Sequence, residues 1–240
     1  MSKTVLEARN LSVGYGGQAV VRDLNLAVRA GEIVCLFGNN GSGKTSTLLT
    51  LAGELPPIDG ETRFLGEATR APLYQRVRRG LAFITDERSL VFSLTARDNL
   101  RLRGGSVDGA LALFPELEPH LDKPAGLLSG GQQQMVAMAR SLANEPRVLM
   151  ADELSLGLAP KLVDRLLRAL RQAADRGLGV LLVEQHVSKA LAISDRALVL
   201  SQGRVVLEGD AADLKQRVGD IEAAYLAGAS EKHRTDKHSG

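Results

Sequence analysis

The feature that most constrains the fold is a glycine-rich turn between the short apolar run 33–37 and a segment from Ser46 onward that can be helical. The turn reads Gly38-Asn39-Asn40-Gly41-Ser42-Gly43-Lys44-Thr45. It fits the pattern G-x-x-x-x-G-K-[ST], in the strand–loop–helix setting that this phosphate-binding loop requires. A glycine-rich strand–helix turn with an incidental lysine is the alternative, but the flanks and the later motifs favour the phosphate loop. The sequence therefore predicts nucleotide binding.

Each part of this loop has a physical role. Glycines let successive backbone N–H groups point at phosphate oxygens, and the following helix presents its positive end to the same anion. We expect Lys44 to reach the β- and γ-phosphates of a bound nucleotide and the Thr45 hydroxyl to hold Mg²⁺. The candidate nucleotide-binding residues of this segment are Gly38, Asn39, Asn40, Gly41, Ser42, Gly43, Lys44, Thr45 and Ser46.

A second apolar run, 147–151, ends in the acidic pair Asp152 and Glu153. We expect this strand to run beside the strand that leads into the phosphate loop, which would turn Asp152 toward the metal. Asp152 would then bind Mg²⁺, and Glu153 would polarise the attacking water as the catalytic acid–base residue. A helix N-cap explains an acidic pair at a strand end about as often, so this prediction depends on the phosphate loop.

The order of elements predicts an α/β fold. Strand patterns fill 4–28, and helices then alternate with strands from residue 130 to 208, which indicates a largely parallel sheet with helices on both faces. Short helical pieces between 86 and about 126 indicate a helical insertion. We expect a phosphate-loop (RecA-like) sheet, mostly parallel, with an N-terminal antiparallel β portion. It would form a single domain over 1–228 with a helical subdomain at about 87–140, and 229–240 would be a flexible tail.

Composition narrows the function. The formal net charge is +2, and only 3% of the residues are aromatic with no Trp, so neither a basic footprint nor a stacking platform for nucleic acid is predicted. The single cysteine, Cys35, lies in an apolar run and is expected to be a packed core thiol. No apolar segment approaches the ~18 residues that a membrane-spanning helix needs. Any membrane role is therefore expected to come through a partner.

Between the two motifs lies Leu128-Ser129-Gly130-Gly131-Gln132. Taken alone, Ser-Gly-Gly before a helix is a common helix start in which the serine caps the first turn. The same features suit a phosphate group supplied from elsewhere. This segment, a little upstream of the acidic strand, resembles the signature of ATP-binding-cassette (ABC) ATPases, and the resemblance extends over 4–228.

The resemblance implies roles for further residues. Tyr15 matches the aromatic residue that stacks on adenine, with a turn-packing tyrosine as the alternative. His186 follows a buried strand as the family's switch histidine does and is assigned a catalytic role, although a histidine there is often only a polar loop residue. Two protomers would share each ATP. The signature residues of one would close over the γ-phosphate held by the other, namely Ser129, Gly130, Gly131 and Gln132.

Two departures from the family pattern stand out. Leu154 follows the catalytic glutamate where the family has proline, and an apolar side chain there keeps the space dry. Many cassettes carry a glutamine that touches Mg²⁺ and the water at the position that Asp86 occupies here. Asp86 is therefore a candidate metal ligand, with Glu87 as the competing register.

Within the superfamily, segments such as 154–160 and 203–209 look most like the ATP-binding subunits of branched-chain amino-acid importers. The expected function is ATP binding and hydrolysis, with Mg²⁺, at the cytoplasmic face of the cell membrane. The expected partners are a second cassette, identical or different, integral membrane permease subunits and, indirectly, a solute-binding protein, with no nucleic acid. The alternatives are the ATPase of another importer or an exporter, a soluble cassette, and a phosphate-loop kinase that would leave the Ser-Gly-Gly segment without a role.

Overall fold

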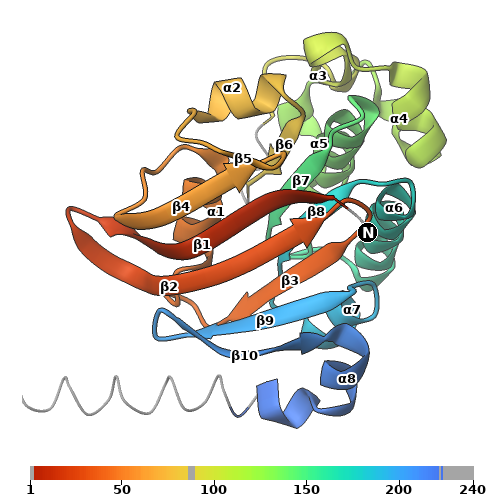
Figure 1. The fold of residues 1–240 in the computed structure, drawn as a ribbon. Coiled ribbons are helices and arrows are strands. Elements are labelled where there is room, and N and C mark those ends of the chain that lie inside the picture. Colours follow the sequence, from red (N-terminus) through yellow and green to blue (C-terminus); the bar gives the residue numbers. More distant parts are fainter. Residues whose placement is uncertain (1–2, 86–89, 222, 224–240) are drawn as a thin grey trace, which may run out of the picture.

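The computed structural model describes residues 3–85, 90–221 and 223 (Figure 1). Its main sheet has six strands in the order β10-β9-β3-β8-β7-β6. The strands from β9 to β6 are parallel, and β10 pairs antiparallel with β9 at one edge. The strands are β3 (Ile33–Gly38), β6 (Leu81–Ile84), β7 (Val148–Asp152), β8 (Gly179–Val183), β9 (Arg196–Ser201) and β10 (Arg204–Asp210).

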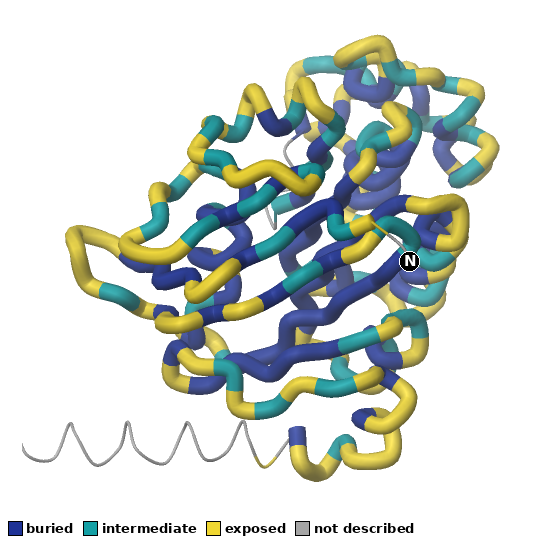
Figure 2. The backbone as a smooth tube through the Cα atoms, viewed as in Figure 1, coloured by how far each residue is buried: buried dark blue, intermediate teal, exposed yellow. Residues whose placement is uncertain are grey.

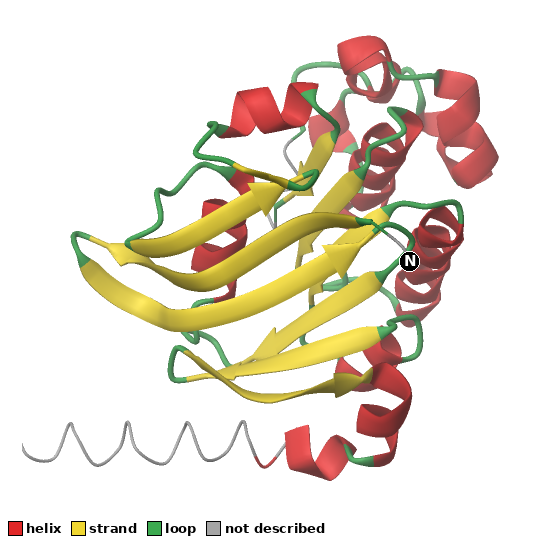
Figure 3. Ribbon diagram, viewed as in Figure 1, coloured by secondary structure: helices red, strands yellow, loops and turns green. Residues whose placement is uncertain are grey.

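A second sheet of four antiparallel strands lies against this one, in the order β2-β1-β4-β5 (Figure 3). Its strands are β1 (Thr4–Tyr15), β2 (Gln18–Arg29), β4 (Asp59–Phe64) and β5 (Glu67–Ala68). Burial alternates along β2, as expected for a strand with one face on the core and one in water. By contrast, β3, β7 and β8 are buried on both faces, which is why they read as continuous apolar runs.

The two faces of the main sheet are covered differently. One face packs against helices and forms a core cluster that includes Cys35, Phe37, Leu149 and Leu182. The other face packs against α1 and the antiparallel sheet, with Leu36, Leu48 and Phe64 among the buried residues. Figure 2 shows the resulting buried interior beneath an exposed rim. The expectation of helices on both faces is thus only partly right, because an antiparallel sheet supplies most of the second cover.

The helices lie mainly on one side of the molecule. They are α1 (Lys44–Ala52), α2 (Leu73–Arg78), α3 (Ala96–Arg101), α4 (Val107–Leu113), α5 (Gly130–Ala143), α6 (Pro160–Asp175), α7 (Val187–Leu191) and α8 (Ala211–Gln216). The 3₁₀ turns are η1 (Leu102–Gly104), η2 (Pro115–His120) and η3 (Ala125–Leu127). The insertion helices α3 and α4 pack on α5 at the end of the molecule away from β10 (Figure 1). None of the described helices is long and apolar enough to cross a membrane.

The predicted fold class is confirmed, with differences in detail. The strand patterns at 4–28 form two continuous strands of 12 residues each. Register shifts along β1 let one long ribbon bend without breaking its pairing. The two-residue strand β5 was not predicted, because so short a segment carries no periodic signal. The assignment of 1–228 as one domain remains a prediction, and the tail 229–240 lies outside the described residues.

Candidate functional site

The candidate site lies where the carboxyl ends of three parallel strands meet. Leu36 of β3 and Asp152 of β7 both pair with Val183 of β8, so the three ends are level. The order is β3-β8-β7, and the expectation that the acidic strand runs next to the loop's strand is therefore wrong. The two motifs still meet because α1 leaves β3 and contacts β7 across the intervening strand. Open α/β sheets bind ligands at such an edge.

The phosphate loop wraps the start of α1. The residue that precedes the helix, Gly43, has a left-handed backbone with φ 100°, and the helix has no side-chain cap. A Cβ at Gly43 would stand 2.2 Å from Val21, and one at Gly38 would stand 2.4 Å from the carbonyl oxygen of Leu200. Larger residues would force the loop apart at both places. The first N–H groups of α1 are thus left for a ligand, as an anion site at a helix start requires.

Lys44 is buried at this helix start, with 5% of its surface exposed. Its Nζ donates to the carbonyl oxygens of Gly38 at 2.7 Å and Asn39 at 3.0 Å. Burial lowers the pKa of Lys44, while the negative charges of Glu153 and Asp152 raise it. Burial deprives the Lys44 ammonium group of water. A phosphate group would replace that lost stabilisation with charge-assisted hydrogen bonds, so the site is suited to an anionic ligand.

Thr45 and Asp152 come together as predicted for a metal site. The Thr45 hydroxyl donates to Asp152 Oδ2 at 2.8 Å, and Asp152 is 5% exposed. The described residues contain no group of three or more His, Cys, Asp or Glu side chains that could hold a metal. One hydroxyl and one carboxylate fit Mg²⁺, because this ion keeps several waters and is held by few protein ligands together with substrate phosphates.

Glu153 has a left-handed backbone, with φ 50°, that an ordinary residue rarely adopts. Its N–H donates to the Val183 carbonyl oxygen at 2.9 Å, and its carboxylate accepts from Gln185 Nε2 at 2.7 Å. Strain of this kind is concentrated at functional sites. Glu153 also lines a cavity of about 360 Å³ together with Lys44 and Thr45. The acid is therefore held by two partners at the mouth of the loop.

The cavity fits a phosphate-bearing ligand. Its lining residues are Val20, Asn40, Gly41, Gly43, Lys44, Thr45, Ser46 and Glu153. Ser42 Oγ is buried beside it and has no hydrogen-bond partner among the described residues. A buried hydroxyl without a partner is unfavourable unless a ligand or water completes it. These features suit a nucleotide phosphate, although the triphosphate itself would extend beyond the loop.

Tyr15 lies beside the loop. Its hydroxyl is 3.4 Å from Ser46 Oγ, which places the ring next to the first turn of α1, and 54% of Tyr15 is exposed. A packing tyrosine in a turn would bury its ring, so the exposed ring is more consistent with a surface that a planar base can cover. The tyrosine and the loop thus lie within reach of one ligand.

The segment Ser129–Gln132 lies at the start of α5, outside the lining of the cavity at the phosphate loop. Ser129 and Gln132 form a capping box, in which the Gln132 N–H donates to Ser129 Oγ and the Ser129 N–H donates to Gln132 Oε1. Gly131 allows close packing, since a Cβ there would stand 2.5 Å from Leu162 of α6. None of this segment is among the described residues that line the cavity. One chain therefore does not bring the two motifs together.

His186 follows β8 and begins α7, where its side chain is exposed. The neighbouring Glu184 is buried and holds the loop after Glu153: its carboxylate accepts from the Ser155 N–H at 3.0 Å and from Ser155 Oγ at 2.5 Å. Burial raises the pKa of Glu184, and the Ser155 and Gln185 hydrogen bonds counteract it. The two loops are thus joined through one carboxyl group. Asp86 and Glu87 lie outside the described residues.

Sequence reasoning missed Glu184 and Gln185. Both contact the acidic loop, one through Ser155 and one through Glu153. The signal that could have found them is positional, because polar residues that end a buried parallel strand lie at the ligand edge of the sheet. The sequence predicts a role in this segment for His186 alone, and residues 183–185 carry only the resemblance to branched-chain importer ATPases.

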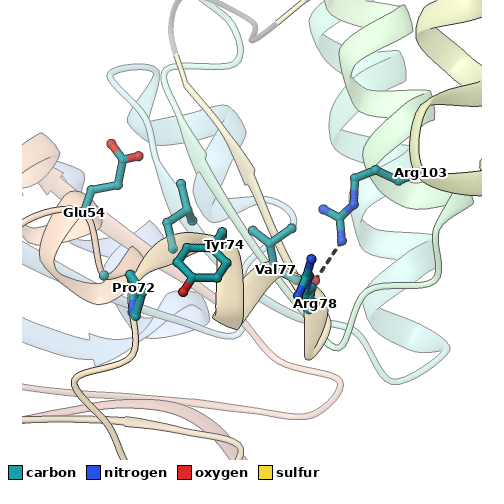
Figure 4. Close-up of a pocket in the computed structure, with 8 residues that line it drawn as sticks. Glu54, Pro72, Tyr74, Val77, Arg78 and Arg103 are labelled. Carbon is teal, nitrogen blue, oxygen red and sulfur yellow. Dashed lines mark hydrogen bonds between the residues drawn. The ribbon is translucent and has the colours of Figure 1, made fainter.

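A second hollow, of about 740 Å³, lies away from the loop on the side of α2 (Figure 4). Tyr74 is 60% exposed here. Arg103 reaches across from the helical part and donates to the Val77 carbonyl oxygen at 2.9 Å. Arg103 has a left-handed backbone, with φ 64°. The lining residues are Gly53, Glu54, Pro72, Leu73, Tyr74, Val77, Arg78 and Arg103.

Comparison with known proteins agrees with this geometry. The model of the ABC transporter family matches residues 21–155. The chain belongs to this family. It is 36% identical, over 93% of its length and 100% of the relative's, to a protein of Pseudomonas aeruginosa named high-affinity branched-chain amino acid transport ATP-binding protein BraG. It is 35% identical, over 88% of its length and 92% of the relative's, to lipopolysaccharide export system ATP-binding protein LptB of Escherichia coli K12.

Solved structures show the same fold. An ATP-binding subunit of an ABC transporter is 29% identical, with a TM-score of 0.79 over 94% of this chain and 99% of that one. A dimeric ATP-binding cassette bound to ADP and Pi in a post-hydrolysis state is 25% identical, with a TM-score of 0.77 over 86% of this chain and 98% of that one. The chain is an ATP-binding ABC transporter subunit and an ATPase. Cassettes of this family dimerise and belong to transporter complexes.

Proposed function

We propose that this chain is the ATP-hydrolysing subunit of an importer for branched-chain or related amino acids. The observation that carries the proposal is its 36% identity to BraG over the whole length of that relative. LptB is almost as similar, at 35%, so an exporter ATPase is the second candidate. The transported solute would meet the membrane subunits and an associated solute-binding protein rather than this chain.

The proposed mechanism starts at the phosphate loop. Residues Gly38–Ser46 hold the phosphates, with Lys44 leaving its two carbonyl partners to bind the β- and γ-phosphates, and Tyr15 stacks on the base. Thr45 and Asp152 would hold Mg²⁺, which would supply positive charge to stabilise the transferred phosphoryl group. Asp86 remains the proposed further ligand. Glu153 orients a water for attack, and Gln185 fixes the carboxylate at 2.7 Å.

The same mechanism needs a second protomer. The segment Ser129–Gln132 presents exposed residues and a helix start at a distance from its own cavity. In the proposed pair, Ser129, Gly130 and Gly131 of one chain approach the γ-phosphate on the other, where the positive end of α5 stabilises negative charge. His186 contacts that phosphate from the side of β8. Binding of ATP then joins the two protomers, and hydrolysis releases them.

We further propose that the hollow beside α2 receives a segment of a permease subunit at the cytoplasmic face of the membrane. It joins α2, which packs beside β6, to the helical part through Arg103. A segment seated there would contact both the sheet part and the helical part, and closure of the protomers would move it (Figure 4). The lining combines the apolar groups of Leu73, Tyr74 and Val77 with two arginines. An apolar segment with an acidic residue would fit.

The test is to tag this chain in its native cell, solubilise the membranes gently and identify what co-purifies. We expect two multi-spanning membrane proteins and a second cassette. Binding of branched-chain amino acids by a co-purifying or genetically adjacent solute-binding protein would support the importer. Lipid-linked glycans in the complex would favour the exporter. Recovery without membrane proteins would contradict both candidates and leave the ATPase activity intact.

A further inference from the structure

The capping box at the start of α5 fixes the orientation of one side-chain amide. The Ser129 N–H is a donor and requires an acceptor, so Gln132 must turn its Oε1 toward it, at 2.9 Å. The other end of that amide, Nε2, carries only N–H donors and points away from the cap. The backbone of the signature segment thus decides which atom of Gln132 faces its surroundings.

What that amide meets is a histidine. His120, at the end of η2, places its Nε2 at 2.8 Å from Gln132 Nε2. Because the amide nitrogen can only donate, the imidazole nitrogen must accept, and the ring proton must sit on Nδ1. His120 Nδ1 is buried with no hydrogen-bond partner among the described residues, so nothing else on the ring competes for this arrangement. The backbone cap therefore sets the histidine tautomer through Gln132.

We propose that His120 is a positioning residue for the signature segment, which it holds through Gln132 while neutral and releases on taking up a proton. The proposal rests on the proposed function, in which this segment closes over the ATP of a second protomer. It assigns to His120 a role in setting how well that segment is ordered, and so makes closure sensitive to pH.

Protonation creates a conflict that one rotation cannot resolve. In the imidazolium both ring nitrogens donate, so Nε2–H would face the Nε2–H groups of Gln132. If the amide flips, its oxygen satisfies the histidine but its nitrogen then faces the Ser129 N–H, and the capping box loses one of its two bonds. Either way one hydrogen bond at the segment is lost. Imidazole side chains exchange this proton between about pH 5 and 8.

The elements packed on η2 carry few charges that would mask this change. It contacts α4 and α5. Glu116 pairs with Arg165 of α6 at 3.6 Å. The charged residues on these elements and in the adjoining turn are Asp108 on α4, Arg140 on α5, Glu116 and Glu118 on η2 itself, and Asp122 and Lys123 after it. In the part of the chain that the structure describes, the side-chain hydrogen-bond partner of the imidazole is Gln132, which is uncharged.

The direct test reads the tautomer without any need for catalysis. The full chain is labelled with ¹⁵N-histidine, and the His120 signals are identified by their loss in His120→Gln. At pH 8 we expect the Nδ1–H tautomer with an unprotonated Nε2. On acidification, the Ser129 amide signal should shift with the same midpoint as the His120 ring. A ring that carries its proton on Nε2 at pH 8 overturns the proposal, as does a Ser129 amide that ignores the titration.

The functional test compares ATP hydrolysis from pH 5.5 to 8.5 in the same assembly. In His120→Gln, an uncharged oxygen near the position of Nε2 can still accept from Gln132. We expect it to match the wild type at pH 8 and to exceed it about three- to tenfold at pH 5.5, the factor that one hydrogen bond supplies. His120→Met lacks a good acceptor and should already be slow at pH 8, with its loss restored in His120→Gln. Glu118→Gln, an exposed change on the same turn, is the matched control.

The outcomes separate this inference from the proposed function. Because every other residue, His186 included, is the same in both proteins, the ratio of His120→Gln to wild type isolates the contribution of His120. A ratio that stays at one across the pH range overturns the role of His120 while leaving the ATPase intact. Absence of hydrolysis in the wild type counts against the proposed function, and the ¹⁵N measurement then decides the role of His120 in ordering the segment by itself.

Discussion

The helices α1 and α5 both have glycine at or just before their first residue, and both are proposed to face phosphate. Their first turns are nevertheless built in opposite ways. At α1 the helix follows Gly43, which has a left-handed backbone and provides no side-chain cap, and its first residue, Lys44, is buried. At α5 the start is closed by the reciprocal bonds of Ser129 and Gln132, and its surface is exposed. The first leaves donors for a ligand; the second satisfies part of its own backbone.

This difference shows which of the two helix starts can bind phosphate within a single chain. An uncapped helix start with Lys44 and a neighbouring acid pair is arranged to bind a nucleotide within one chain. A capped start is more stable without a ligand, because the N–H groups of Ser129 and Gln132 already have side-chain partners. It suits a surface that must stay ordered while waiting for a nucleotide carried by another protomer. Variants at the two helix starts and beside them can test this division between binding and closing.

The largest effect is expected at the catalytic acid. Glu153→Gln keeps the shape of the side chain and an oxygen for the Gln185 hydrogen bond, but removes the base that orients water. Turnover should fall about 10²–10⁴-fold with ATP affinity nearly unchanged. Steady-state hydrolysis and fluorescent-nucleotide binding measure the two quantities. Normal turnover in this variant would contradict the assignment of Glu153.

Lys44→Ala should act on binding itself. The change removes charge-assisted hydrogen bonds to phosphate, so the Kd for ATP should rise roughly ten- to a hundredfold. The measurement is nucleotide binding by the isolated chain. Lys161→Ala, at an exposed position on α6, is the charge-matched control. An unchanged affinity would mean that α1 does not hold the phosphates.

Gly131→Ala tests the start of α5, as Lys44→Ala tests the start of α1. The new methyl group would stand 2.5 Å from Leu162 Cδ2, so either the Leu162 side chain changes rotamer or the start of α5 shifts, at a cost of up to about 1–3 kcal/mol. Hydrolysis should fall about tenfold while ATP binding by the isolated chain stays the same. Leu162→Ala in the same chain should restore part of the rate by making room. A parallel loss of affinity would break the division between the two helix starts.

The smallest effect is expected at Tyr15. Tyr15→Leu removes the exposed ring beside Ser46 and should weaken ATP binding about two- to tenfold, the usual range for aromatic stacking. Tyr15→Phe keeps the ring and should bind like the wild type. Comparison with a base-free triphosphate sharpens the result, because its affinity should not respond to either change. Equal weakening of both ligands would assign Tyr15 to the loop rather than to the base.

Much of this arrangement follows from local sequence. The apolar runs that became β3, β7 and β8 are buried on both faces, so their assignment required only length and composition. Thr45 and Asp152, both predicted to hold one Mg²⁺, are in contact, although the strand order assumed for Asp152 was wrong. The family assignment is confirmed by the comparisons, whereas the roles of the individual site residues remain predictions.

The predictions that proved wrong concern features set by packing between segments that are distant in the sequence. Nothing in residues 147–153 indicates that β8 inserts between β7 and β3, because strand order depends on how distant segments pack. The same holds for the cover over one face of the sheet, where the antiparallel ribbon displaced the expected helices. Contacts made by single polar residues, such as Gln185 with Glu153, leave no periodic signature.

The buried carboxyl group of Glu184 has a mechanical consequence. Two direct hydrogen bonds join it to Ser155, and both residues are buried. Separating them would strand a desolvated acid. The backbone after Glu153 and the backbone before His186 are therefore expected to move as one unit. A displacement of the exposed Leu156 would therefore be transmitted through its neighbour Ser155 to Glu184 and to the backbone that leads to His186.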